Sequence, residues 1–117
     1  MMNPSLDAVR LTAVERQILG ELKSVLQSSL GNRLRRAALF GSRARGDGGP
    51  QSDIDVAIVV DGLDRNLKRE VFDLVAELEL KHLRAISLLA FSTDQFDDLL
   101  ERERRLAEDI VHEGIAL

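Results

Sequence analysis

The sequence predicts an α/β (α+β) fold in which a small mixed sheet of three or four strands is flanked by helices. Short β-rich runs alternate with longer segments whose apolar residues recur at helical spacing, and this order is typical of a sheet covered by helices. The length of 117 residues suits one domain with one core, and 44% hydrophobic with 31% charged residues is an ordinary globular balance. We therefore expect a single domain over residues 1–117, with its core at about 12–115.

Residues 12–32 predict the first helix. Thr12 and Glu15 have the spacing of a capping box, in which each side chain binds the backbone N–H of the other residue. Gly31 gives a natural end, because glycine adopts the left-handed conformation at little cost. Apolar residues recur at helical period between these limits, namely Val14, Ile18, Leu22, Val25 and Leu26.

Two strands are predicted next, over residues 35–40 and 53–60. The second is an almost continuous apolar run, as expected of a strand that is covered on both faces. The segment between them predicts a helical turn at 41–46, which runs into a loop because three glycines and a proline fall within residues 46–51.

The rest of the chain predicts a helix over 67–83, a strand over 85–91 and a last helix that opens at Ser92. Ser92 and Gln95 repeat the capping-box spacing, Gly114 ends the last helix, and residues 115–117 predict a terminal strand. The run of charged residues at 101–105 weakens the middle of that helix. The expected apolar positions of the two helices are Leu67, Val71, Leu74 and Leu78, then Phe96, Leu99, Leu100, Leu106 and Ile110.

Composition narrows the function classes. The chain has no cysteine, which excludes disulfides and thiolate metal sites. It has neither a signal-peptide pattern nor an apolar run near the ~20 residues of a membrane span, so we expect a cytoplasmic protein with no membrane partner. The net charge of -4 argues against extended nucleic-acid binding.

A local excess of positive charge departs from that acidic average. Five arginines fall within residues 33–45 with no acid among them. Such a cluster would suit a small polyanion such as a nucleoside triphosphate, and it is equally compatible with a solvated basic edge. The five residues are Arg33, Arg35, Arg36, Arg43 and Arg45.

Asp53 and Asp55 are the candidate metal ligands. Residues two apart in a strand point to the same face, with backbone positions roughly 6.5–7 Å apart. Two unpaired carboxylates at that distance repel by about 2–3 kcal/mol at an effective dielectric near 20. A divalent cation would offset this repulsion, and magnesium prefers such hard oxygen ligands. Arginine partners or simple exposure of the carboxylates are the alternatives.

Gly41 and Ser42 precede the aspartates by a fixed spacing: Gly41-Ser42, ten residues, Asp53, one residue, Asp55. A glycine at a strand end lets the backbone turn sharply and approach a ligand. Serine supplies a hydroxyl, and backbone N–H groups at the start of a helical turn attract phosphate. The sequence therefore predicts a phosphate site beside a metal site.

Residues 41–60, which read GSRARGDGGPQSDIDVAIVV, resemble the nucleotidyltransferase superfamily with the DNA polymerase beta-like fold. They are most similar to the minimal nucleotidyltransferases, which are single small domains. The resemblance implies attack of a hydroxyl on the α-phosphorus of a nucleoside triphosphate, with ATP as the default, and release of pyrophosphate. It implies that Asp53 and Asp55 are catalytic and bind Mg²⁺, and that Gly41 and Ser42 bind the nucleotide.

The resemblance also suggests Arg43 and Arg45 as nucleotide-binding residues that contact the triphosphate. The family uses a third carboxylate on the next strand, where it completes the metal site and helps to deprotonate the acceptor. Alignment by the apolar pattern places Ser87 at that position, so this chain departs from the family there. Glu77, Glu79, Asp94 and Asp61 are nearby in sequence, on predicted helices or loops.

Minimal nucleotidyltransferases resemble the antitoxin of toxin–antitoxin pairs whose toxin is a HEPN-type ribonuclease. The resemblance therefore implies a protein partner, and it is compatible with a homo-oligomer. Two functions stay open: an enzyme that transfers AMP to the toxin, and a weakened relative that neutralises the toxin by contact alone. A drug-modifying transferase is a third function, but the sequence shows no second substrate domain.

Overall fold

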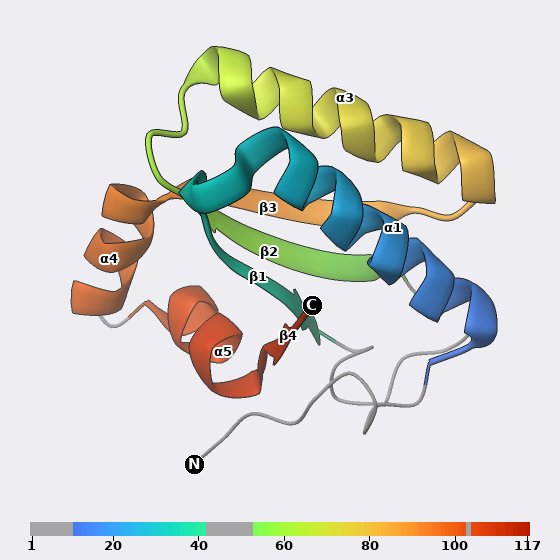
Figure 1. The fold of residues 1–117 in the computed structure, drawn as a ribbon. Helices are drawn as coiled ribbons and strands as arrows, with labels where there is room; N and C mark the ends of the chain where they lie inside the picture. Colours follow the sequence, from blue (N-terminus) through green and yellow to red (C-terminus); the bar gives the residue numbers. More distant parts are fainter. Residues whose placement is uncertain (1–10, 42–52, 103) are drawn as a thin grey trace.

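A computed structural model of the chain describes residues 11–41, 53–102 and 104–117 (Figure 1). The predicted mixed sheet is confirmed, with four strands in the order β3-β2-β1-β4. Strand β1 is antiparallel to both of its neighbours, and β2 is parallel to β3. The strands are β1 Leu34–Phe40, β2 Ile54–Val60, β3 Ile86–Ser92 and β4 Ile115–Ala116.

Helices cover both faces of this sheet, as Figure 1 shows. Helices α1 and α3 lie side by side on one face, and α4 and α5 lie on the other. A short 3-10 turn, η2, joins α1 to β1. The helical segments are α1 Ala13–Leu30, η2 Gly31–Arg33, α3 Arg65–His82, α4 Thr93–Glu101 and α5 Arg105–Glu113.

Helix α1 begins and ends where the sequence predicts. The Thr12 side chain accepts the Glu15 N–H at 3.1 Å, and the Glu15 side chain accepts the Thr12 N–H at 2.8 Å. Gly31 follows the last turn with a φ of 54°. The expectation that Val14 faces the core is wrong, because its side chain is 49% exposed and the next residue, Glu15, is buried instead.

The main core lies between the sheet and the pair α1 and α3. Alternate residues of β2 face it, as the continuous apolar run of that strand requires when both faces are covered. Helix α3 starts earlier than predicted because the Asp64 side chain caps it by accepting the Leu67 N–H at 2.8 Å. Buried members from the sheet and both helices are Ile18, Leu19, Leu22, Leu26, Leu39, Ile54, Val56, Ile58, Val60, Val71, Val75 and Leu78.

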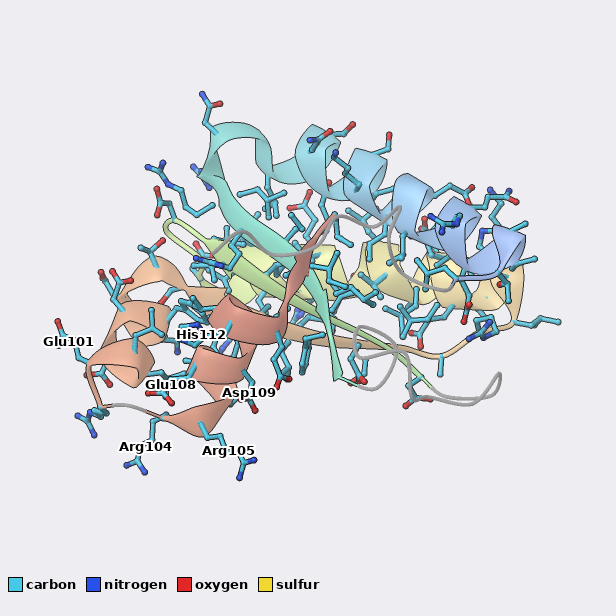
Figure 2. The ribbon with its side chains drawn as sticks, turned by 90° about the horizontal axis from the view of Figure 1, so that it is seen from below. Glu101, Arg104, Arg105, Glu108, Asp109 and His112 are labelled. Atoms are coloured by element: carbon cyan, nitrogen blue, oxygen red, sulfur yellow. The ribbon has the colours of Figure 1, made fainter. Side chains whose placement is uncertain are left out.

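The prediction of a single last helix after Ser92 is wrong, because the chain forms two helices, α4 and α5, in that segment. Helix α4 ends at Glu101, and the Arg104 N–H reaches back to the Leu99 carbonyl at 2.9 Å, a longer step than a continuing helix makes. The break changes the phase of the second helix, so Leu106 is 41% exposed while Ala107 and Ile110 are buried. Arg104 and Arg105 point away from the body of the protein at this connection (Figure 2).

A second, smaller core lies under α4 and α5. It contains Ala57 and Val59 of β2, with Phe96, Ala107 and Ile110 of the two helices. The same strand therefore supplies side chains to both cores. None of the helices in the described part of the chain is long and apolar enough to span a bilayer.

An ion pair between Arg35 and Asp61 stabilises the end of β2 that is far from Asp53 and Asp55. Asp61 follows β2, and its carboxylate accepts hydrogen bonds from the Thr93 hydroxyl and from Arg35 Nε, the latter at 2.5 Å. These two hydrogen bonds, with Thr93 as the larger cause, lower the pKa of Asp61. The pair joins β1, β2 and the start of α4.

Candidate active site

Three strands bring the candidate residues to one end of the sheet. Because β1 and β2 are antiparallel, the last residue of β1, Phe40, lies opposite Asp55. Because β2 and β3 are parallel, Asp55 has Ser87 as its neighbour on the other side. Gly41, Asp55 and Ser87 therefore meet across the middle of the sheet, at the point where β1 ends and β2 and β3 begin.

Asp55 lies on the face of the sheet that α4 and α5 cover. Ala57 and Val59 alternate with it along β2 and contribute to the smaller core, whereas Ile54 and Val56 contribute to the main one. Asp55 is half-buried, near the end of the covered surface. A carboxylate at this position of an otherwise buried strand is costly unless its charge is balanced.

Asp53 precedes β2 and is exposed. It therefore lies two residues before Asp55, at the end of the sheet where β1 ends and β2 and β3 begin, which we call the open end because Asp53 is exposed there. The alternation of the strand does not extend to it, so the shared face that the sequence predicts for the two carboxylates stays a prediction.

Gly41 is required by its contact with Asp55. A Cβ atom built on this glycine would lie 2.5 Å from Asp55 Oδ2 and 3.2 Å from its Cγ, so the Asp55 carboxylate would have to move to admit any other residue. The backbone of Gly41 also has a φ of 73°, which L side chains rarely adopt. Gly41 and Asp55, the two ends of the sequence motif, thus pack against each other, and the Asp55 carboxylate contacts the backbone of Gly41.

The remaining nucleotide-binding candidates, Ser42, Arg43 and Arg45, fall outside the described residues, as does the predicted turn and loop that would carry them. The phosphate half of the site is thus a prediction from the sequence. The described part contains the two candidate metal ligands, Asp53 and Asp55, and Gly41.

Ser87 shares a face with Asp55, because its neighbours Ile86 and Leu88 both point into the main core. Adjacent strands lie about 4.8 Å apart, so Ser87 is the residue of β3 that lies beside Asp55 in the register. In the part of the chain that the structure describes, no three His, Cys, Asp or Glu side chains gather into one group, so a metal bound here would need further ligands from a nucleotide or from water.

The four alternative acids do not take the place of Ser87 in this arrangement. Asp61 follows the far end of β2, where it binds Arg35 and Thr93. Glu79 Oε2 accepts the Ile86 N–H at 3.0 Å and so serves the backbone of β3. Glu77 lines a groove between α1 and α3, on the outside of the main core, and Asp94 is exposed in the first turn of α4.

The donor set fits a hard divalent cation. Asp53 and Asp55 offer carboxylate oxygens at the open end of the sheet, and magnesium sites commonly combine one or two carboxylates with substrate phosphates and water. The Asp55 carboxylate packs against the backbone of Gly41, where the absence of a side chain leaves room for it. The chain would thus supply two ligands and leave the rest to the nucleotide.

Comparison with known proteins decides the family. Residues 20–117 match the family described as "Polymerase beta, Nucleotidyltransferase". This chain belongs to that family. As a member of the polymerase beta nucleotidyltransferases, it has the fold that the resemblance at residues 41–60 implied, and its nucleotidyl-transfer chemistry is that of a family that generally uses a nucleoside triphosphate and a divalent metal.

Two relatives of this nucleotidyltransferase come from Methanocaldococcus jannaschii. One, named "Putative protein adenylyltransferase MJ0604", is 36% identical over 83 residues, which are 71% of this chain and 79% of the relative. The other, named "Putative protein adenylyltransferase MJ0141", is 33% identical over 76 residues, which are 64% of this chain and 77% of the relative. Most of each relative is therefore comparable with this chain.

We predict that Gly41→Ala disrupts the metal half of the site. The new methyl group would collide with the Asp55 carboxylate, so we expect Mn²⁺, used as a spectroscopic substitute for Mg²⁺, to bind at least about tenfold more weakly. Titration followed by electron paramagnetic resonance measures this affinity.

Gly62→Ala is the matched control. Gly62 has a similar φ of 67°, but a Cβ there would meet nothing within 4 Å. The free energy of unfolding should fall by about 1–2 kcal/mol in both variants, because alanine is disfavoured in the left-handed conformation. Gly62→Ala should keep its affinity for Mn²⁺. Equal Mn²⁺ affinity in the two variants would contradict a role for the contact between Gly41 and Asp55.

Proposed function

We propose that this chain is a magnesium-dependent nucleotidyltransferase that binds ATP and transfers AMP to a hydroxyl of a protein partner. The observation that carries the proposal is the seating of the Asp55 carboxylate against Gly41, at the open end of the sheet. Membership of the nucleotidyltransferase family supports the reaction class. The names of the two archaeal relatives support a protein as the acceptor.

The residues divide the work of binding. Asp53 and Asp55 would hold Mg²⁺, which when bound would neutralise charge on the triphosphate and on the leaving group. The backbone at Gly41 and the hydroxyl of Ser42 would hold phosphate oxygens, and Arg43 and Arg45 would offset their remaining charge. Phosphoryl transfer depends mainly on such positioning and charge neutralisation.

The reaction itself exchanges one bond to phosphorus for another. The acceptor oxygen forms a bond to the α-phosphorus, the bond from that phosphorus to the bridging oxygen breaks, and pyrophosphate leaves. The proton of the acceptor must pass to a base. Ser87 cannot take this role as a carboxylate would, so the proton would go to water or to a group of the partner. Loss of a general base costs about 10²–10⁴ in rate, which predicts slow turnover.

The partner that we propose is a HEPN-type ribonuclease toxin, with this chain as its antitoxin. The short motif from Gly41 to Asp55 resembles the minimal nucleotidyltransferases, which pair with such toxins. Under this proposal the partner presents the accepting hydroxyl at the open end of the sheet, next to Ser87.

A second function is favoured by Ser87 itself. With a neutral hydroxyl in place of the third carboxylate, the chain would retain the fold and bind the toxin without modifying it. Neutralisation would then depend on contact between the two proteins alone.

Mass spectrometry of the purified protein, its candidate toxin and Mg-ATP tests the first function. We expect the toxin to gain the mass of one AMP, and we expect this adduct to disappear with the double variant Asp53→Ala/Asp55→Ala. Asp73→Ala, which removes an exposed carboxylate from α3, is the control and should leave the adduct unchanged.

The same mixtures separate the two functions. If the toxin is fully neutralised by the double variant, and the wild-type chain leaves no adduct on it, the enzyme proposal fails and neutralisation by contact stands.

Ser87→Asp should restore the missing negative charge. The new carboxylate would stand beside Asp55 in the register that the strands already have. We expect Mn²⁺ affinity or the rate of AMP transfer to rise by about tenfold or more, measured by titration and by single-turnover kinetics. If neither quantity changes, then Ser87 does not line the site.

A further inference from the structure

An ion pair between a fully buried carboxylate and a partly buried guanidinium joins α1 to the turn before β3, and it has no part in the proposed chemistry. Among the residues that the structure describes, Glu15 is the only polar or charged residue that is fully buried, with 0% of its surface exposed. Its Oε2 accepts a hydrogen bond from Arg84 Nη2 at 3.1 Å, and its Oε1 accepts the Thr12 N–H. Burying the Glu15 charge costs several kcal/mol before the attraction of Arg84 offsets it, so stability alone is weak grounds for such a pair.

Arg84 belongs to the turn that connects α3 to β3. The turn begins at Leu83, which ends α3 in the left-handed conformation with a φ of 51° although it is not a glycine. The Arg84 N–H then binds the Glu79 carbonyl at 3.3 Å. The ion pair therefore joins the first turn of α1 to a tight connection with a strained residue.

The residues after Arg84 hold the starts of the two parallel strands. The Ala85 carbonyl accepts the Ile54 N–H at 3.1 Å, and Ile54 lies directly between Asp53 and Asp55 in the chain. The Ile86 N–H binds Glu79 Oε2 at 3.0 Å, and Ile86 immediately precedes Ser87. The turn thus sets the backbone on both sides of the candidate site.

We infer that the ion pair between Glu15 and Arg84 positions the metal-binding carboxylates. The ion pair would hold the turn between α3 and β3 in place, and with it the Ala85 carbonyl. That carbonyl binds the first residue of β2, so the ion pair would also keep Asp55 in register with Ser87. Glu15 and Arg84 are positioning residues in this account, because they act through the backbone. The inference rests on the proposed function for the metal and for the effect on catalysis, whereas the effect on the strand backbone is independent of it.

The same two helices offer a matched control. Glu21 of α1 accepts hydrogen bonds from Lys81 and His82 of α3, and these bonds, that of Lys81 first, lower the pKa of Glu21. This ion pair also joins α1 to α3. In the part of the chain that the structure describes, however, neither Glu21 nor Lys81 has a hydrogen bond to β2 or to the turn between α3 and β3. Its loss should loosen the packing of the helices without moving the carboxylates.

The experiment compares the double variants Glu15→Met/Arg84→Met and Glu21→Met/Lys81→Met. Methionine replaces both charges with a flexible apolar side chain, so that no charge is left buried alone. We expect the first variant to keep its melting temperature within about 5 °C while Mn²⁺ binds about tenfold more weakly, because misplaced ligands lose affinity even in a folded protein. We expect AMP transfer to lose kcat by about 10–100-fold with little change in KM for ATP.

Hydrogen exchange of the Ile54 and Ile86 amides supplies a readout that needs no activity. Exchange at both amides should accelerate at least about tenfold in Glu15→Met/Arg84→Met and stay unchanged in the control variant. If the first variant does not fold, Glu15→Gln replaces it. That change keeps the acceptor for Thr12 but removes the charge opposite Arg84, and it should shift the same amides in the same direction.

Unchanged exchange, Mn²⁺ affinity and kcat in a folded variant would overturn the inference. A wild-type chain that neither binds Mn²⁺ nor transfers AMP would instead sink the proposed function. In that event, the exchange rates of the two amides still decide whether the ion pair holds the strands.

Discussion

The packing of the Asp55 carboxylate against Gly41 sets the conditions for the rest of the structure. It requires a glycine with a positive φ directly after β1 and a carboxylate at the second position of β2. The antiparallel register of β1 and β2 brings these two positions together. A slip of one residue would turn Asp55 into the main core and Ile54 out of it. The core around β2 and the candidate site therefore depend on the same alignment.

The two layers of helices follow from that strand. Because β2 is apolar on both faces, it needs cover on both, and α1 with α3 on one side and α4 with α5 on the other provide it (Figure 1). Helices α4 and α5 lie toward one end of their face (Figure 1), and at the opposite end, where β2 and β3 begin, Asp55 and Ser87 are only half-buried. A charged residue is tolerated there, and at that end a nucleotide and a protein acceptor would meet.

Most of the fold could be predicted from the sequence, because its signals are local. The capping boxes at Thr12 and Ser92 form as predicted, and the strands lie within one residue of their predicted positions. What could not be predicted depends on contacts between distant segments. Glu15 reads as a capping residue and gives no sign of its burial against Arg84, and the seat of Asp55 on Gly41 requires the register of two strands. The break after Glu101 was visible only as a weak apolar pattern.

The central claim is that Asp53 and Asp55 hold a metal that a nucleotide shares. A crystal structure of the chain with Mg²⁺ and a non-hydrolysable ATP analogue tests it most directly. We expect a magnesium ion about 2.0–2.1 Å from oxygens of both carboxylates and of the triphosphate, with the α-phosphorus facing Ser87. A triphosphate bound elsewhere, or bound at this end of the sheet without a metal on Asp55, would contradict it.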